Sequence, residues 1–162
     1  MKAPISLKNG STLFLKLVVG TMALVALMAS VFVFPRTIIA ERQGDFDYMP
    51  MLLALYATAL ISLVALYQTL KLLSYIDHNK AFSRASIAAL RTIRYCAAII
   101  SLIFALELPY MFVVADRDDA PGVVAVGLLL AGGSFVVATA VAVFQKLMQS
   151  AVDMKSEQDL TV

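Results

Sequence analysis

Four long apolar blocks constrain this chain of 162 residues more than any other feature. They cover residues 17–34, 51–73, 93–115 and 122–144, and Glu107 is the one carboxylate inside them. An α-helix needs about 20 apolar residues to cross the roughly 30 Å hydrocarbon core of a bilayer. Four such blocks therefore predict an all-α protein built as a four-helix transmembrane bundle.

The composition favours a membrane protein with a single domain. Hydrophobic residues make up 61% of the chain, whereas soluble domains average about 45–50% apolar residues. The first block is longer than the usual core of a signal peptide, roughly 7–15 residues, so we expect it to be kept as a span. The expected domain covers residues 1–162, and its spans, with their cytoplasmic extensions, lie near 13–34, 51–75, 84–115 and 122–150.

Lysine and arginine are distributed unevenly between the two predicted sides of the membrane. Only Arg36, Arg42 and Arg117 lie in the loops after the first and third blocks. Because cytoplasmic loops are enriched in basic residues, the pattern predicts that both termini lie in the cytoplasm. The ten basic residues on that side are Lys2, Lys8, Lys16, Lys71, Lys80, Arg84, Arg91, Arg94, Lys146 and Lys155.

The helices that cross the membrane are expected to continue into the cytoplasm. Ser83 suits the N-cap of a helix, and no proline follows it before Pro109. An unbroken helix over 84–115 would be about 48 Å long at 1.5 Å per residue, which exceeds the hydrocarbon thickness. Helices two to four therefore extend on the inner side in this interpretation, and most of the surface open to a soluble partner is cytoplasmic.

A basic stripe, defined as Lys80, Arg84, Arg91 and Arg94, begins this extension. It can bind the anionic headgroups of the inner leaflet, or an acidic surface of a protein partner. Alternatively, the basic stripe serves only to orient the bundle in the membrane. The sequence leaves these alternatives open.

Glu107, close to Pro109 and Tyr110, is the candidate polar site inside the membrane. A carboxylate in lipid is costly, so it should face the bundle interior, pair with another group or be protonated. It could handle a proton or cation, or recognise the amine of a ligand. It could equally be a structural carboxyl that bonds a hydroxyl or reaches the headgroups. No second ionisable group is available to pair with it, which argues against a proton relay.

The chain offers no pair of catalytic groups. His78 is the only histidine, with Asp77 and Asn79 beside it, and Cys96 is the only cysteine. Metal binding and acid–base catalysis need several convergent side chains. We therefore expect no enzyme activity, no metal, no cofactor and no direct contact with nucleic acid. Small residues four apart, such as Gly127 and Ala131, suit close helix packing and allow a homo-oligomer.

Two segments carry a resemblance to a known family. One is Asp-His-Asn-Lys-Ala-Phe-Ser at 77–83, with Leu-Arg-Thr-Ile at 90–93, and the other is the tail Ser-Glu-Gln-Asp-Leu-Thr-Val at 156–162. The chain resembles a bacterial family of small four-span membrane proteins catalogued as a domain of unknown function. The resemblance implies a location in the bacterial inner membrane. Members are often encoded beside a Cro/CI-type helix-turn-helix regulator, which implies a membrane protein that recruits or restrains a transcription factor.

The function expected from the sequence is therefore the docking or regulation of a cytoplasmic protein without catalysis. Two alternatives remain: a small transporter or ligand-binding bundle that uses Glu107, or an accessory subunit of a larger membrane complex. The residues expected to contact a partner are Asn79, Phe82, Ser83, Arg84, Arg91, Asp159, Leu160 and Thr161.

Overall fold

The computed structural model describes residues 6–28, 31, 32, 35, 39, 48–77 and 82–159, with side chains from residue 13 to residue 155. Four helices are described in these ranges: α1 (Ser6–Met28), α3 (Met49–Asp77), α4 (Arg84–Arg117) and α5 (Gly122–Asp159). No strand occurs in the described ranges. The all-α fold class predicted from the apolar blocks is confirmed.

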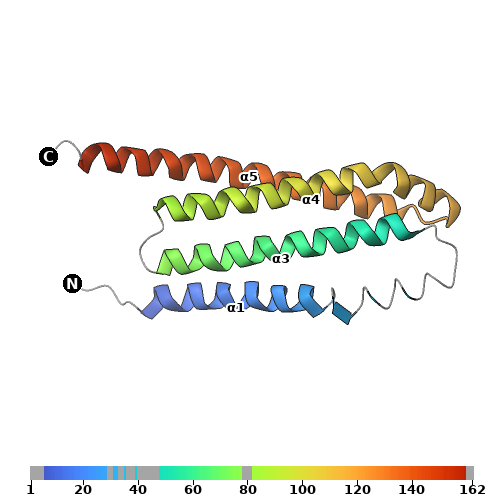
Figure 1. The fold of residues 1–162 in the computed structure, drawn as a ribbon, viewed down its shortest axis with the longest axis horizontal. Coiled ribbons are helices and arrows are strands. Elements are labelled where there is room, and N and C mark those ends of the chain that lie inside the picture. Colours follow the sequence, from blue (N-terminus) through green and yellow to red (C-terminus); the bar gives the residue numbers. More distant parts are fainter. Residues whose placement is uncertain are drawn as a thin grey trace.

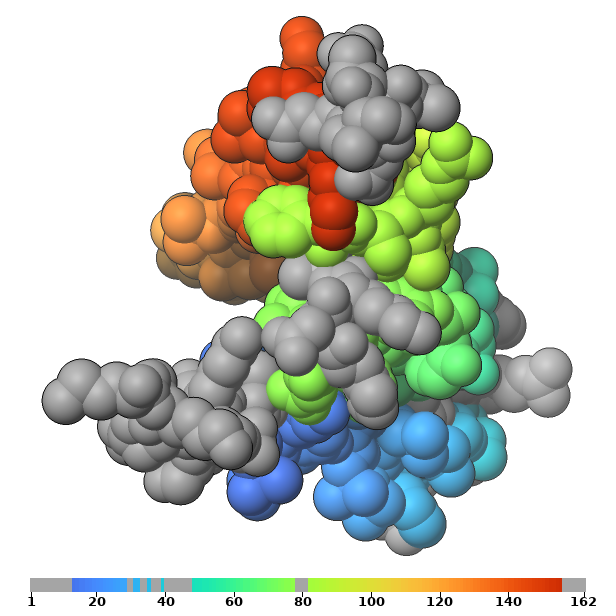
Figure 2. All heavy atoms as spheres, turned by 90° about the vertical axis from the view of Figure 1, so that its left-hand side faces the viewer, coloured from blue at the N-terminus to red at the C-terminus, as the bar shows by residue number. Residues whose placement is uncertain are grey.

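The helices run alternately up and down, and their packing follows the order of the chain (Figure 1). The most extensive contact joins α4 to α5, the next joins α3 to α4, and a smaller one joins α1 to α3. Figure 2 looks along the bundle from the end where α1 begins and α5 ends, and there α1 and α5 lie on opposite sides of α3 and α4. The α4–α5 hairpin is therefore the most closely packed unit of the fold, with α5 at one edge of the bundle.

The residues near the ends of the helices account for where the helices begin and continue. Ser83 is the N-cap of α4, as the sequence predicts, and its side chain accepts a hydrogen bond from the backbone N–H of Ser86 at 3.2 Å. Pro109 lies inside α4, where it removes one backbone hydrogen bond without ending the helix. The helix continues to Arg117, and α5 continues to Asp159 rather than ending near residue 150.

Three helices, namely α3, α4 and α5, are long and apolar enough to cross a membrane by length and composition. The apolar part of α1 is the shorter stretch Leu13–Met28, and residues 29, 30, 33 and 34 of the first predicted span lie outside the described residues. Large apolar side chains such as Leu106 and Leu129 are more than 70% exposed. Apolar surface of this extent is stable against lipid, not against water.

Two hydrophobic clusters hold the bundle, one near each end of α4. Ile87 and Leu90 pack with Met148 of α5 at the first end. Phe104 and Met111 pack with Ala131 of α5 at the second. Between them, the Ser101 hydroxyl donates a hydrogen bond to the Ala131 carbonyl at 2.8 Å, and such a bond between helices adds stability where no water competes.

The helix ends are joined by polar contacts. The Tyr48 hydroxyl, just before α3, donates a hydrogen bond to Oδ2 of Asp118 at 2.6 Å, which ties α3 to the α4–α5 turn. At the opposite end, Lys16 of α1 forms an ion pair with Asp77 of α3. Both contacts lie at the ends of the apolar segments, where the polar groups remain close to water or headgroups.

At Gly127, α5 packs closely against side chains of α4. A Cβ atom there would overlap the Sδ atom of Met111 and lie 3.5 Å from Cδ2 of Leu108. Met111 is only 3% exposed, so its side chain has little room to move away. By contrast, a Cβ atom on Gly132 of the same helix would meet no atom within 4 Å.

We therefore predict that Gly127→Val destabilises the α4–α5 hairpin by about 1–3 kcal/mol, the usual cost of overpacking. The matched variant Gly132→Val should change the unfolding free energy by less than about 0.5 kcal/mol, because only helix propensity differs there. Denaturant unfolding in detergent, followed by circular dichroism, measures both. Equal effects of the two variants would contradict the close approach at Gly127.

Candidate functional site

Glu107 lies on α4, two residues before Pro109, and its side chain is half-buried. Its Oε2 atom is buried and has no hydrogen-bond partner in the described part of the chain. Buried polar atoms are nearly always paired, and a buried unpaired carboxylate is among the most expensive groups to leave without a partner. This atom is therefore the first candidate for a binding role.

Glu107 lines a pocket of about 300 Å³ between α3, α4 and α5. It is the only ionisable side chain among the residues that line the pocket, while Pro109 and Tyr110 do not line it. Helix α3 contributes Met51 and Leu55 to one wall. The other lining residues are Phe104, Met111, Gly122, Val123, Val126, Gly127 and Leu130.

The pocket combines a carboxylate with apolar walls. Helix α4 turns Glu107 toward the same side as Phe104 and Met111, which lie three and four residues away, because residues at this spacing share a helix face. Gly127 keeps α5 close on the opposite side. Such a site can accept a hydrogen bond from an amine or ammonium group, and it can surround an apolar body attached to that group.

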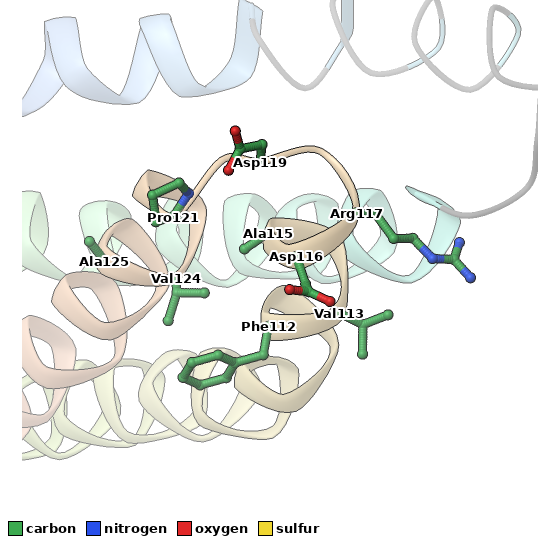
Figure 3. A pocket seen from close by; sticks show the side chains of 9 residues that line it. All are labelled: Phe112, Val113, Ala115, Asp116, Arg117, Asp119, Pro121, Val124 and Ala125. Carbon is green, nitrogen blue, oxygen red and sulfur yellow. The ribbon is translucent and has the colours of Figure 1, made fainter.

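A wider and shallower hollow of about 960 Å³ lies at the turn between α4 and α5 (Figure 3). Asp116, Asp119 and Arg117 all line it, and the Arg117 side chain extends away from the turn. Asp119 adopts a φ of 51°, which an aspartate tolerates better than most residues. No group of three or more His, Cys, Asp and Glu side chains suited to a metal occurs among the described residues.

The residues predicted to contact a protein partner are only partly described. Asn79, Leu160 and Thr161 lie outside the described residues, and the side chain of Asp159 does as well. Phe82, which is 62% exposed, lies directly before α4. Arg84 and Arg91 are exposed on α4, whereas the Ser83 hydroxyl is engaged in capping the helix.

The basic stripe does not form one uniform surface. Lys80 lies outside the described residues, and Arg84 and Arg91 are exposed. Arg94 is half-buried, with its guanidinium 4.9 Å from the centre of the Tyr95 ring. It borders a separate cavity together with Lys146.

Sequence reasoning overlooked two residues that shape these sites. Gln145 is 7% exposed, although it follows the last apolar block directly. Gln145 lies three residues before Met148, another buried residue of α5. Residues at this spacing share a helix face, so the spacing could have predicted the burial of Gln145. Gly127 was noticed only as a member of a small-residue pair, and its contact with Met111 needed the tertiary structure.

Comparison with known proteins identifies the family. The family described as "Protein of unknown function (DUF2975)" matches residues 17–162. The chain belongs to this family. It is also 44% identical over 156 residues to "Uncharacterized membrane protein YoaS" of Bacillus subtilis (strain 168), covering 94% of this chain and 98% of that protein. No solved structure matches this DUF2975 chain.

The resemblance seen in the sequence is thus confirmed at the level of the family. The three long apolar helices and the named relative together make this DUF2975 member a membrane protein. The family description assigns no activity and no site residues. The function must therefore be argued from the pockets and surfaces of the chain.

Proposed function

We propose that this DUF2975 protein crosses the bacterial cytoplasmic membrane several times, with both termini and the connection between α3 and α4 in the cytoplasm. The arrangement of the helices supports this topology, because α1 begins, α3 ends, α4 begins and α5 ends at one end of the bundle (Figure 1). Ten of the thirteen basic residues belong to that end in the sequence, and cytoplasmic loops are enriched in basic residues.

Single cysteines test this orientation in a Cys96→Ala background. Ala85→Cys lies at the proposed cytoplasmic end of α4 and Asp116→Cys at its other end, and both positions are exposed. A membrane-impermeant maleimide should label Asp116→Cys in intact spheroplasts, and it should label Ala85→Cys only after permeabilisation. The reverse pattern would overturn the proposed orientation.

Within this topology, we propose that the protein binds an amphiphilic ligand without catalysis, with a cationic amine of the ligand at Glu107. The observation that carries the proposal is the buried, unpartnered Oε2 of Glu107 at the wall of an otherwise apolar pocket. An ionised carboxylate held in apolar surroundings without a partner is strongly unfavourable. A ligand ammonium that pairs with the carboxylate offsets part of this cost.

The walls of the Glu107 pocket favour a ligand with an apolar body. Leu55, Phe104 and Val126 offer apolar contacts from three different helices. The volume of about 300 Å³ is at the lower end for small-molecule sites. A primary amine that carries an alkyl chain or a ring meets both requirements, because its charge pairs with Glu107 and its apolar part leaves water.

A dansyl-labelled alkylamine tests the Glu107 site in purified protein, and the chain contains no tryptophan that would interfere with its fluorescence. Glu107→Gln should weaken binding at least tenfold, or about 1.4 kcal/mol, because the charge pair is lost. Asp116→Asn removes an exposed carboxylate near the same end of α4 and should stay within twofold. Unchanged affinity in Glu107→Gln, with an unchanged circular dichroism spectrum, would refute the site.

A second proposed function is the docking of a cytoplasmic protein, and the exposure of Phe82 favours it. The start of α4 behind this aromatic ring is firmly anchored, with Ser86 fully buried and Ile87 8% exposed. A rigid, exposed aromatic side chain is typical of an interface anchor. The nearby charges of Arg84 and Arg91 suit an acidic partner surface. We propose a Cro/CI-type helix-turn-helix regulator as this partner.

Co-expression with a Cro/CI-type helix-turn-helix regulator from the same organism tests this docking. Phe82→Asp should reduce the co-purified regulator at least tenfold, since it places a charge at the contact. Phe82→Leu keeps an apolar side chain and should retain most of the binding. Full retention with Phe82→Asp, combined with full retention after removal of residues 156–162, would count against docking.

A further inference from the structure

A second cavity, of about 400 Å³, lies between α4 and α5 near the end of the bundle opposite Glu107. Its chemistry is the reverse of that of the Glu107 pocket, because its lining residues in the described part of the chain include two cations and two amides and no acidic side chain. By volume it could hold about a dozen water molecules. The lining residues are Arg94, Ala142, Val143, Gln145, Lys146 and Gln149.

The two cations lie at the depth of lipid phosphates. Arg94 is about 33 Å along α4 from Asp116, and Lys146 is about 36 Å along α5 from Gly122, at 1.5 Å per residue. The hydrocarbon core is roughly 30 Å thick. If the α4–α5 turn lies at one membrane surface, Arg94 and Lys146 therefore lie at the other.

Gln145 is a lining residue of the cavity with an unsatisfied polar atom. Its side chain is only 7% exposed, and its buried Oε1 atom has no hydrogen-bond partner in the described part of the chain. A glutamine amide has two donor hydrogens and an oxygen that accepts. A buried acceptor left without a donor costs about 1–3 kcal/mol. A ligand hydroxyl in the cavity would supply the missing donor.

The cavity also adjoins the lipid-facing surface. Val143, which forms part of its wall, is 61% exposed, and Phe144 and Leu147 beside it on α5 are 54% and 64% exposed. An acyl chain can follow these side chains while its headgroup occupies the polar cavity. This continuity between polar and apolar parts favours a lipid over a free anion.

We propose that this cavity binds the headgroup of an anionic phospholipid that carries a free hydroxyl group. Arg94 and Lys146 hold the phosphate, and the headgroup hydroxyl donates a hydrogen bond to Oε1 of Gln145. Basic pockets between helices on the cytoplasmic side are suited to anionic headgroups. Arg84 and Arg91 are exposed and do not line the cavity, so they serve as internal controls.

Native mass spectrometry of the full chain in detergent tests the proposal, with phosphatidylglycerol as the probe lipid. Phosphatidylglycerol should bind at least tenfold more tightly than phosphatidylcholine, which is zwitterionic and lacks the hydroxyl. Arg94→Gln combined with Lys146→Gln should remove this preference, whereas Arg84→Gln combined with Arg91→Gln should keep it. Lys146→Gln alone, at an exposed position, should still weaken binding severalfold if the double variant does not fold.

The hydroxyl contact has its own test. Gln145→Leu removes the acceptor and should lower phosphatidylglycerol binding severalfold while leaving phosphatidic acid, which has no glycerol headgroup, within twofold. Inorganic phosphate in tenfold excess should not displace the lipid, and efficient displacement would make the cavity a site for a soluble anion. Unchanged lipid binding in both Lys146→Gln and the double variant would overturn the proposal.

The headgroup site is independent of the proposed functions. Glu107→Gln should leave phosphatidylglycerol binding unchanged, because the two cavities share no lining residue. In the unaltered protein, lipid binding without alkylamine binding would therefore refute only the Glu107 site, and alkylamine binding without lipid binding would refute only the headgroup site.

Discussion

The close antiparallel packing of α4 against α5 is the interaction on which the rest of the structure depends. A short turn joins the two helices, and Gly127 allows α5 to approach the buried Met111 of α4. Apolar side chains gain little free energy when they move from lipid into a contact between helices. Helix association in the membrane therefore depends on close contacts and on hydrogen bonds such as that from Ser101 to Ala131. Helices α3 and α1 then add to one side of this hairpin.

Both candidate sites lie along this hairpin, and they are chemically opposite. Near the turn, the Glu107 pocket presents an unpartnered carboxylate among apolar walls. Toward the other end, the second cavity presents Arg94 and Lys146 with the buried amide of Gln145. The described structure thus leaves two buried side-chain oxygens without partners, and each belongs to one of these cavities. The packing around each site offsets the free-energy cost of these two unpaired oxygens.

The placement of these buried polar groups connects structure to function in a membrane protein. Polar groups inside the membrane occur where they contact a ligand, a protein partner or water, because the lipid hydrocarbon forms no hydrogen bonds with them. The cation pair at one membrane surface can fix the depth and orientation of the hairpin through a bound headgroup. With the hairpin fixed in this way, the Glu107 pocket would lie at a defined depth inside the bilayer core, and the exposed Phe82 would lie beyond the surface at which the cation pair is held.

The sequence by itself determined the class of fold and several of its details. The apolar blocks predicted the helices, and the cap at Ser83 predicted the start of α4, because both depend on local chemistry and on the length that a bilayer imposes. It also singled out Glu107 as the one carboxylate within the blocks. Which side chains share a cavity was decided only by tertiary structure. Arg94 and Lys146 are 52 positions apart in the sequence and meet because α4 and α5 pack with one particular rotation and offset. Side-chain packing across the interface sets that rotation, and the pattern of apolar residues, which is nearly uniform around each helix, does not encode it.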